Sequence, residues 1–253
     1  MSAGADGLDD FFYQLGRRTG RGLRRGRWLV SALSGPTPEA IAAEYGAGRD
    51  LARTYEAGVS LDETPASHAL VARIGERLGA RLKNKQRRWR VVAISDPQPG
   101  AFALPGGFLY VTSGLIEVCA GDESEIAWVV GHEMGHVVHG HAAARLAGEL
   151  AGSVAARAAV GPTGALAQWL VTTGVRAVAR AYSRDQELEA DAFGARLASA
   201  AGFDPEAALR VCTRLEQFEA RSRQPLAEYF ASHPPLRLRA ERIGAWLEAQ
   251  RTS

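Results

Sequence analysis

Cysteine is scarce in this 253-residue sequence. Cys119 and Cys212 are its only two cysteines, and they lie far apart and outside any CxxC pattern. This scarcity argues against a disulfide framework and against a zinc site built from thiolates. Such cysteine usage fits a reducing compartment, and we expect a cytoplasmic location.

The chain also has little net charge. Its 30 lysines and arginines nearly balance 28 aspartates and glutamates, which leaves a formal charge of +2 at pH 7. So small an excess does not favour nucleic acid as a partner. Six arginines are nevertheless gathered between Arg17 and Arg27, within a stretch from Leu8 to Leu33 that we expect to be helical. We interpret it as a solvated helix with an apolar stripe on the core, with contact to phosphates or anionic lipid as the alternative.

Apolar runs long enough to form a transmembrane helix are absent. Residues 158–175 come closest, since they carry no charge, but they include Pro162, Gln168 and three glycines. We expect a buried helical hairpin there, with a membrane-dipping element and peripheral membrane association as the alternative. The small, acidic start of the chain predicts no signal peptide, and Arg24–Arg25 resembles a twin-arginine signal only faintly.

The order of the remaining patterns predicts an α+β chain that is mostly helical. After the basic stretch, Thr37 with Pro38 begins a helix that runs to about Ala57, and Pro65 opens another that ends near Leu82. Three short apolar segments follow and are separated by prolines and glycines. We expect them to form a small, mostly antiparallel sheet from residues 91–94, 101–104 and 108–112.

Helices return after the sheet. Asp122 with Glu125, and Ser183 with Gln186, have the spacing of a capping box. We expect helices at residues 115–118, from 123 to near 147, from 184 to about 200, from 204–205 to about 220, and after Pro235.

The second of these helices contains His132-Glu133-Met134-Gly135-His136. Two histidines four residues apart lie on one helix face and can present ring nitrogens to one metal ion, while the glutamate faces its water-bearing position. Catalytic zinc usually has three protein ligands. The metzincin spacing for the third ligand is excluded, because its glycine and histidine positions hold His139 and Ala142.

The helix that begins at residue 184 offers the missing ligand. Glu187 and Asp191 are four residues apart and share a face, whereas Glu189 points about half a turn away. We assign Glu187 as the third zinc ligand and Asp191 as the acceptor of a histidine N–H. Glu133 is then placed to act as the general base in hydrolysis.

Five motifs occur in an order that resembles one group of proteins. They are Phe102-Ala103-Leu104-Pro105-Gly106-Gly107, Val111-Thr112-Ser113-Gly114-Leu115, the HEMGH pentapeptide, residues 182–191 and His233-Pro234-Pro235. The chain resembles the HtpX-like and CAAX-prenyl-protease family of gluzincin metallopeptidases, especially its soluble branch. The resemblance implies a zincin-like fold, zinc held by His132, His136 and Glu187, Glu133 as general base, and hydrolysis of peptide bonds.

The resemblance covers about residues 65–245, and the N-terminal helices carry none of it. We therefore divide the chain into a helical N-terminal extension, residues 1–60, and a catalytic domain, residues 61–253. Gly100 is one departure, since relatives commonly have asparagine there.

Further residues are candidates for the cleft. An extended substrate could add to the strand containing Phe108 and Tyr110, with Gly106 and Gly107 permitting close approach; the alternative is an ordinary buried hairpin. By the resemblance, His233 lies near the cleft, where it donates to an oxyanion or serves as a fourth metal ligand.

Other polar side chains have a less defined role. We expect Arg184 to pair with a nearby acid or to remain solvated, and we expect His139 and His141 to be structural. Tyr110, Tyr182 and Tyr229 stay open as oxyanion donors.

These features predict a zinc endopeptidase acting on polypeptides, such as unfolded or damaged proteins. A closed-cleft, chaperone-like or regulatory binding module that keeps the fold is the alternative; in it, the apolar hairpin or His233 covers the metal. An aminopeptidase would need an acidic subsite for the free amine, and no motif for one is evident.

Overall fold

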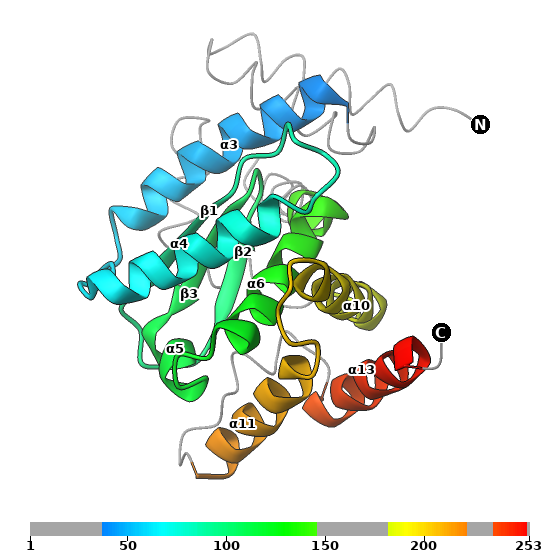
Figure 1. The fold of residues 1–253 in the computed structure, drawn as a ribbon. Coiled ribbons are helices and arrows are strands. Elements are labelled where there is room, and N and C mark those ends of the chain that lie inside the picture. Colours follow the sequence, from blue (N-terminus) through cyan, green and yellow to red (C-terminus); the bar gives the residue numbers. More distant parts are fainter. Residues whose placement is uncertain (1–36, 146–181, 222–234, 252–253) are drawn as a thin grey trace, which may run out of the picture.

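The computed structural model describes residues 37–145, 182–221 and 235–251 (Figure 1). The expected basic helix, the apolar stretch at 158–175, Tyr229 and His233 lie outside these residues. The helices are α3 (Pro38–Glu56), α4 (Pro65–Gly79), α5 (Ser113–Val118), α6 (Glu123–Val138), α10 (Arg184–Ala200), α11 (Ala207–Arg221) and α13 (Leu236–Arg251), and the strands are β1 (Arg90–Ile94), β2 (Ala101–Leu104) and β3 (Phe108–Thr112).

Three helices begin at the side chains that the sequence indicates. The Thr37 hydroxyl accepts a hydrogen bond from the backbone N–H of residue 40, and Pro38 opens the first turn of α3. Asp122 accepts from two backbone N–H groups at the start of α6. Ser183 and Gln186 form a reciprocal capping box before α10. These caps satisfy N–H groups that have no partner within the helix, and the predicted starts are confirmed.

The predicted end of α6 is wrong. The helix stops at Val138 instead of continuing to residue 147, and Gly140 adopts a φ of 74°. Glycine reaches this left-handed conformation without the steric cost that a Cβ brings, so it ends the helix and redirects the chain. The backbone is helical again from residue 141 to the end of the described range at 145.

The sheet has the strand order β1-β3-β2 and is mixed rather than mostly antiparallel. β2 and β3 form an antiparallel hairpin through Gly106 and Gly107, whose φ angles are 82° and 93°. β1 pairs in parallel with the other edge of β3, from Arg90↔Phe108 to Ile94↔Thr112. The loop at 95–100 carries the chain from β1 to β2 on the opposite edge, and β3 then returns between the two.

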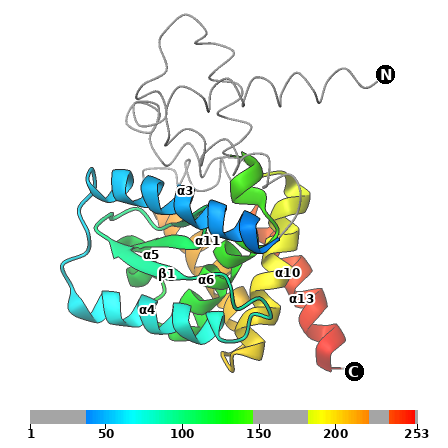
Figure 2. The same ribbon diagram turned by 90° about the horizontal axis from the view of Figure 1, so that it is seen from above.

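Helices cover both faces of the sheet (Figure 2). Alternate strand residues point to opposite faces, as the pleat requires. On one face, Val92, Ile94, Phe102, Leu104, Phe108 and Tyr110 form a cluster with Leu51 and Ala52 of α3. On the other face, Val91, Ala93, Ala103, Leu109 and Val111 pack with α4 and α6 in the larger core cluster.

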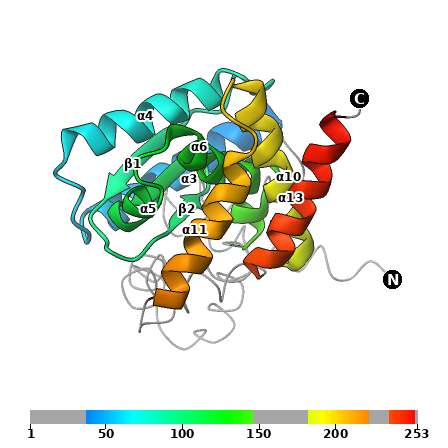
Figure 3. The same cartoon turned by 60° about the horizontal axis from the view of Figure 1, so that its bottom comes forward.

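The larger core continues away from the sheet through the C-terminal helices. α10 packs along α6. Figure 3 shows α11 and α13 side by side, with α11 against α6 and α13 against α10. α6 is consequently covered by the sheet and by helices, and every residue from Glu125 to Val137 is buried. The expected α+β, mostly helical, zincin-like architecture is confirmed, apart from the strand directions. No helix in the described residues is both long and apolar enough to cross a membrane.

Candidate metal centre

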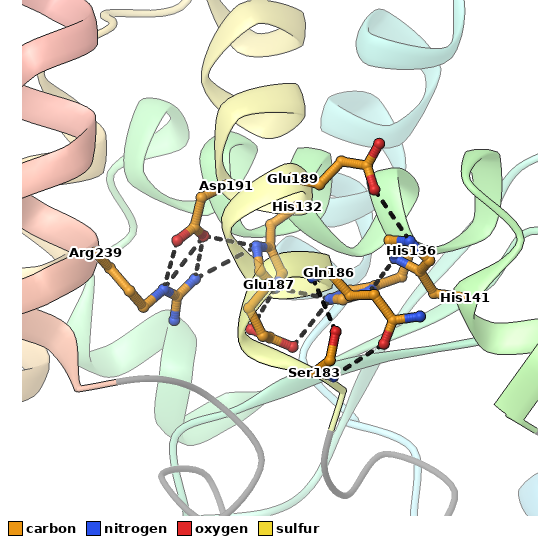
Figure 4. Close-up of polar contacts among 9 residues, drawn as sticks. All are labelled: His132, His136, His141, Ser183, Gln186, Glu187, Glu189, Asp191 and Arg239. Atoms are coloured by element: carbon orange, nitrogen blue, oxygen red, sulfur yellow. Dashed lines mark hydrogen bonds and ion pairs between the residues drawn. The ribbon is translucent and has the colours of Figure 1, made fainter.

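Three buried side chains from α6 and α10 converge on one point (Figure 4). The Nε2 atoms of His132 and His136 lie 3.1 Å apart. The Glu187 carboxylate faces them, with Oε2 3.5 Å from His132 Nε2 and Oε1 3.3 Å from His136 Nε2. Their ligand atoms all lie within 4.8 Å of one another. Two imidazoles and one carboxylate are a donor set that fits zinc, so these residues could hold such an ion.

Small residues allow α6 and α10 to approach closely enough to build this site. A Cβ on Gly194 would lie 2.7 Å from the backbone nitrogen of His132, and one on Gly131 would lie 3.1 Å from the Cα of Gly194. One turn away, a Cβ on Gly135 would lie 3.2 Å from the Cα of Ala190. The two backbones therefore touch, and this contact places Glu187 against the histidines.

His132 is held from behind by a buried ion pair. Its Nδ1 lies 2.8 Å from Asp191 Oδ1. Arg239 of α13 binds that carboxylate twice, through Nη2 at 2.6 Å and Nε at 2.9 Å, and its guanidinium lies 5.0 Å from the centre of the Trp128 ring. Burial alone would raise the pKa of Asp191, but Arg239 and His132 hold it well below its usual range. Asp191 therefore stays ionised and can accept the His132 N–H.

Arg239 is a residue of this site that the sequence analysis missed. It is fully buried, although it belongs to a helix with many exposed charges. One signal was present: Arg239 lies on the same helical face as Leu236, Ile243 and Leu247, all of which are buried. A charged residue within an apolar stripe indicates a buried partner, which here is Asp191.

His136 is contacted on its other side by a different set of groups. Its Nδ1 lies 3.1 Å from His141 Nδ1, and the Tyr182 ring stacks on its imidazole with a centroid distance of 3.7 Å. Glu189 reaches both neighbouring histidines, at 3.3 Å from His141 Nε2 and 3.1 Å from His139 Nδ1. Burial lowers the pKa of His141, against the opposing effect of Glu189, which favours the neutral ring.

Glu133 lies between the metal-ligand residues and the sheet. It is buried, and the backbone amide of Ala103 in β2 is near enough to favour its ionised form. Burial raises the pKa of Glu133 to about 7, against the lowering effect of His132. A cation held by the nearby ligands would lower this pKa and keep the carboxylate ionised. Glu133 is thus positioned to exchange a proton at neutral pH.

The predicted substrate strand is wrong, because β3 is the central strand and both of its edges are paired. Gly106 and Gly107 support the fold instead. The Gly106 N–H donates to Glu44 of α3 at 2.9 Å, and a Cβ on Gly107 would lie 2.1 Å from the Arg88 carbonyl oxygen. Phe108 and Tyr110 are buried against α3. No strand can add to β3, whereas β2 is the edge strand beside α6.

Arg184 lies at the exposed start of α10, away from the convergent side chains. It forms no ion pair with another residue in the described ranges. His233 falls outside those ranges, so its placement near the cleft stays a prediction.

Comparison with known proteins shows what this chain is similar to. Residues 65–247 match the model of Peptidase family M48. The mitochondrial metalloendopeptidase OMA1 of Schizosaccharomyces pombe is 35% identical over 184 residues, covering 71% of this chain and 53% of that protein. The protein of the same name from Saccharomyces cerevisiae is 32% identical, covering 63% of this chain and 47% of its own length. The metalloprotease YcaL of Escherichia coli is 32% identical over 178 residues, covering 68% of this chain and 67% of that protein. The chain thus spans about half the length of the two yeast relatives.

Proposed function

Because this chain belongs to Peptidase family M48, we propose that it is a zinc-dependent endopeptidase that hydrolyses peptide bonds in polypeptides. The observation that carries the proposal is the convergence of His132, His136 and Glu187, with Glu133 buried beside them. Zinc fits because the donor set offers two imidazole nitrogens and one carboxylate from two rigid helices. The metalloprotease names of the relatives support the same activity.

The site residues have separate tasks in this reaction. His132, His136 and Glu187 would hold the ion. Zinc, when bound, supplies Lewis acidity that lowers the pKa of water and polarises the scissile carbonyl. Glu133 accepts the proton of the attacking water and delivers it to the leaving amine. The nearby Ala103 backbone amide favours the ionised Glu133 carboxylate, and Asp191 fixes the tautomer of His132.

The substrate would lie along β2 rather than β3. A peptide in extended conformation can add to a sheet edge through main-chain hydrogen bonds. β2 is an edge strand and packs beside α6, and the backbone of its Ala103 is near enough to Glu133 to lower the pKa of that carboxyl. This arrangement would accept unfolded chains of varied sequence, which fits a role in protein quality control.

Domain division and location are part of the proposal. We assign residues 1–60 to an N-terminal extension and 61–253 to the catalytic domain. The packing of α3 on one face of the sheet indicates that the extension helps to support the catalytic domain. We propose a cytoplasmic location, with peripheral membrane association as the alternative. Cell fractionation with an antibody to the chain would distinguish them.

The direct test combines metal analysis with casein cleavage. The wild type should contain about one zinc ion per chain, and Glu133→Gln should retain it while losing about 100-fold or more in cleavage rate. Asp185→Asn, which removes an exposed carboxylate at the start of α10, serves as a control and should cleave normally. Wild type without stoichiometric zinc, or equal cleavage by Glu133→Gln, would contradict the proposal.

The same assay tests the alternative function, a closed-cleft binding module. In that case the wild type would hold zinc without cleaving casein. Activity that appears in His233→Ala, or after removal of residues 148–180, would then favour the closed cleft. An active wild type excludes it.

A further inference from the structure

The break after α6 brings a third histidine to the metal centre. In a continuous α-helix, residue 141 would lie about 140° around the axis from residue 136 and would point away from it. The turn at Gly140 ends the helix, and the His141 ring returns so that its Nδ1 lies 3.1 Å from His136 Nδ1. His141 is buried, so this contact is shielded from bulk water.

Glu189 in turn holds His141 from the surface of α10. The two carboxylate oxygens divide between the histidines: Oε2 faces His141 Nε2 and Oε1 faces His139 Nδ1. The Glu189 side chain is 49% exposed, so its charge keeps contact with water while it binds the rings. A carboxylate beside His141 Nε2 favours a proton on that nitrogen.

Only one arrangement of protons satisfies these contacts when His136 binds a metal. The Nε2 atom of His136 faces Glu187 and His132 and must present a lone pair, so its proton resides on Nδ1. That Nδ1–H donates to His141 Nδ1, which must therefore be unprotonated. The proton of neutral His141 then lies on Nε2 and donates to Glu189.

We propose that His141 and Glu189 are positioning residues that hold His136 in the tautomer and ring orientation required for metal binding. The proposal rests on the metal site of the proposed function, although it concerns metal affinity and not catalysis. Groups that hold a metal-ligating histidine from behind typically change metal affinity by about 10–100-fold when they are removed.

The first experiment measures zinc affinity by competition with a chromophoric chelator. Glu189→Gln should bind zinc about 10-fold more weakly than the wild type, because a neutral carboxamide holds the His141 N–H less strongly than a carboxylate does. Asp185→Asn makes the same charge change on the same helix without a histidine contact and should leave affinity unchanged. Heat denaturation of the metal-free proteins should give equal midpoints for wild type and Glu189→Gln.

The second experiment tests the turn rather than the carboxylate. Gly140→Ala forces an alanine into a left-handed conformation, although a Cβ there would meet no atom within 4 Å. Gly121→Ala is a matched control, since Gly121 has a φ of 73° and equally open space at the turn before α6. Both variants should lose similar stability, and only Gly140→Ala should lose zinc affinity. Gly140→Asn should restore most of it, because asparagine tolerates this conformation.

Nitrogen-15 NMR of the zinc-loaded protein with labelled histidine reports the tautomers. The wild type should show a proton on His136 Nδ1 and on His141 Nε2, and Glu189→Gln should change the His141 signals. Unchanged zinc affinity in Glu189→Gln and Gly140→Ala, or a proton on His141 Nδ1 in the wild type, would overturn the proposal while leaving the proposed function intact. A wild type that binds no zinc would overturn both.

Discussion

The two metal-facing histidines are supported by very different surroundings. Behind His132, Asp191 and Arg239 form a buried ion pair that joins α6, α10 and α13. Behind His136, the contacts come from His141 five residues on, from the half-exposed Glu189 that binds His141, and from the stacked Tyr182 ring. Both histidines need a fixed imidazole tautomer. A buried ion pair provides it for His132, and the turn after α6 provides it for His136.

This difference separates stability from metal binding. A buried ion pair costs much desolvation, so removal of one partner leaves an uncompensated charge inside the protein. An exposed carboxylate loses little hydration when it forms an ion pair. Water therefore readily takes the place of a partner that is removed. Changes to the residues behind His132 should therefore alter folding stability. Changes to the residues behind His136 should alter mainly the affinity for zinc.

The largest effect is expected for Arg239→Leu. The substitution leaves the buried Asp191 carboxylate without its cation and should lower the free energy of unfolding by about 3–5 kcal/mol. Arg237→Leu is the control, because the Arg237 side chain is 87% exposed and pairs with Glu241 on the same helix. It should change stability little. Urea denaturation of both metal-free variants measures the difference, and equal losses would show that the buried pair is not coupled to folding.

A pH-dependent effect should distinguish the two buried carboxylates. The pKa of Glu133 is raised from 4.5 to about 7, so its contribution to stability is present below its unfolded pKa and is lost as the pH rises through 7. The pKa of Asp191 is lowered, so its contribution is present at neutral pH and is lost only in acid.

Metal-free wild type should accordingly lose up to about 3 kcal/mol relative to Glu133→Gln between about pH 5 and about pH 8. Urea denaturation across this range, in the presence of a chelator, checks the slope. A constant difference between the two proteins would contradict a raised pKa for Glu133.

Local patterns predicted much of this molecule because local forces determine them. The starts of α3, α6 and α10 follow from Thr37, Asp122 and Ser183, whose side chains bond to the helix that each precedes. The spacing of Glu187 and Asp191 also follows from helix geometry, and the structure brings both side chains to the histidines.

Other features depend on contacts that sequence spacing does not contain. The order β1-β3-β2 follows from how the hairpin packs between α3 and α6, so the edge strand was assigned wrongly. Arg239 lies far from Asp191 in the sequence and meets it only because α13 packs on α10. Gly140 did carry a local signal, since glycine often ends helices, but the strong apolar pattern on either side of it favoured a continuous helix.

A moderate effect is expected where α6 and α10 touch. Gly194→Ala adds a Cβ 2.7 Å from the backbone nitrogen of His132, so the helices must separate, at a cost of about 1–3 kcal/mol. Gly244→Ala in α13 meets no atom within 4 Å and should instead stabilise the protein by about 0.5–1 kcal/mol. Urea denaturation measures the change in the free energy of unfolding for each variant, and the two changes should have opposite signs. Zinc affinity should fall only for Gly194→Ala, and a fall in both would rule out helix separation as the cause.

The smallest effect on zinc affinity is expected at His139, the second histidine that Glu189 contacts. His139→Asn removes one partner of Glu189 but leaves the contact between Glu189 and His141. Because the Glu189 carboxylate is half-exposed, water replaces the lost ring at little cost. Zinc affinity should change by less than about 2-fold, compared with about 10-fold for Glu189→Gln. If His139→Asn weakens zinc binding as much as Glu189→Gln does, Glu189 acts through both histidines together, and support of His136 would not pass through His141 alone.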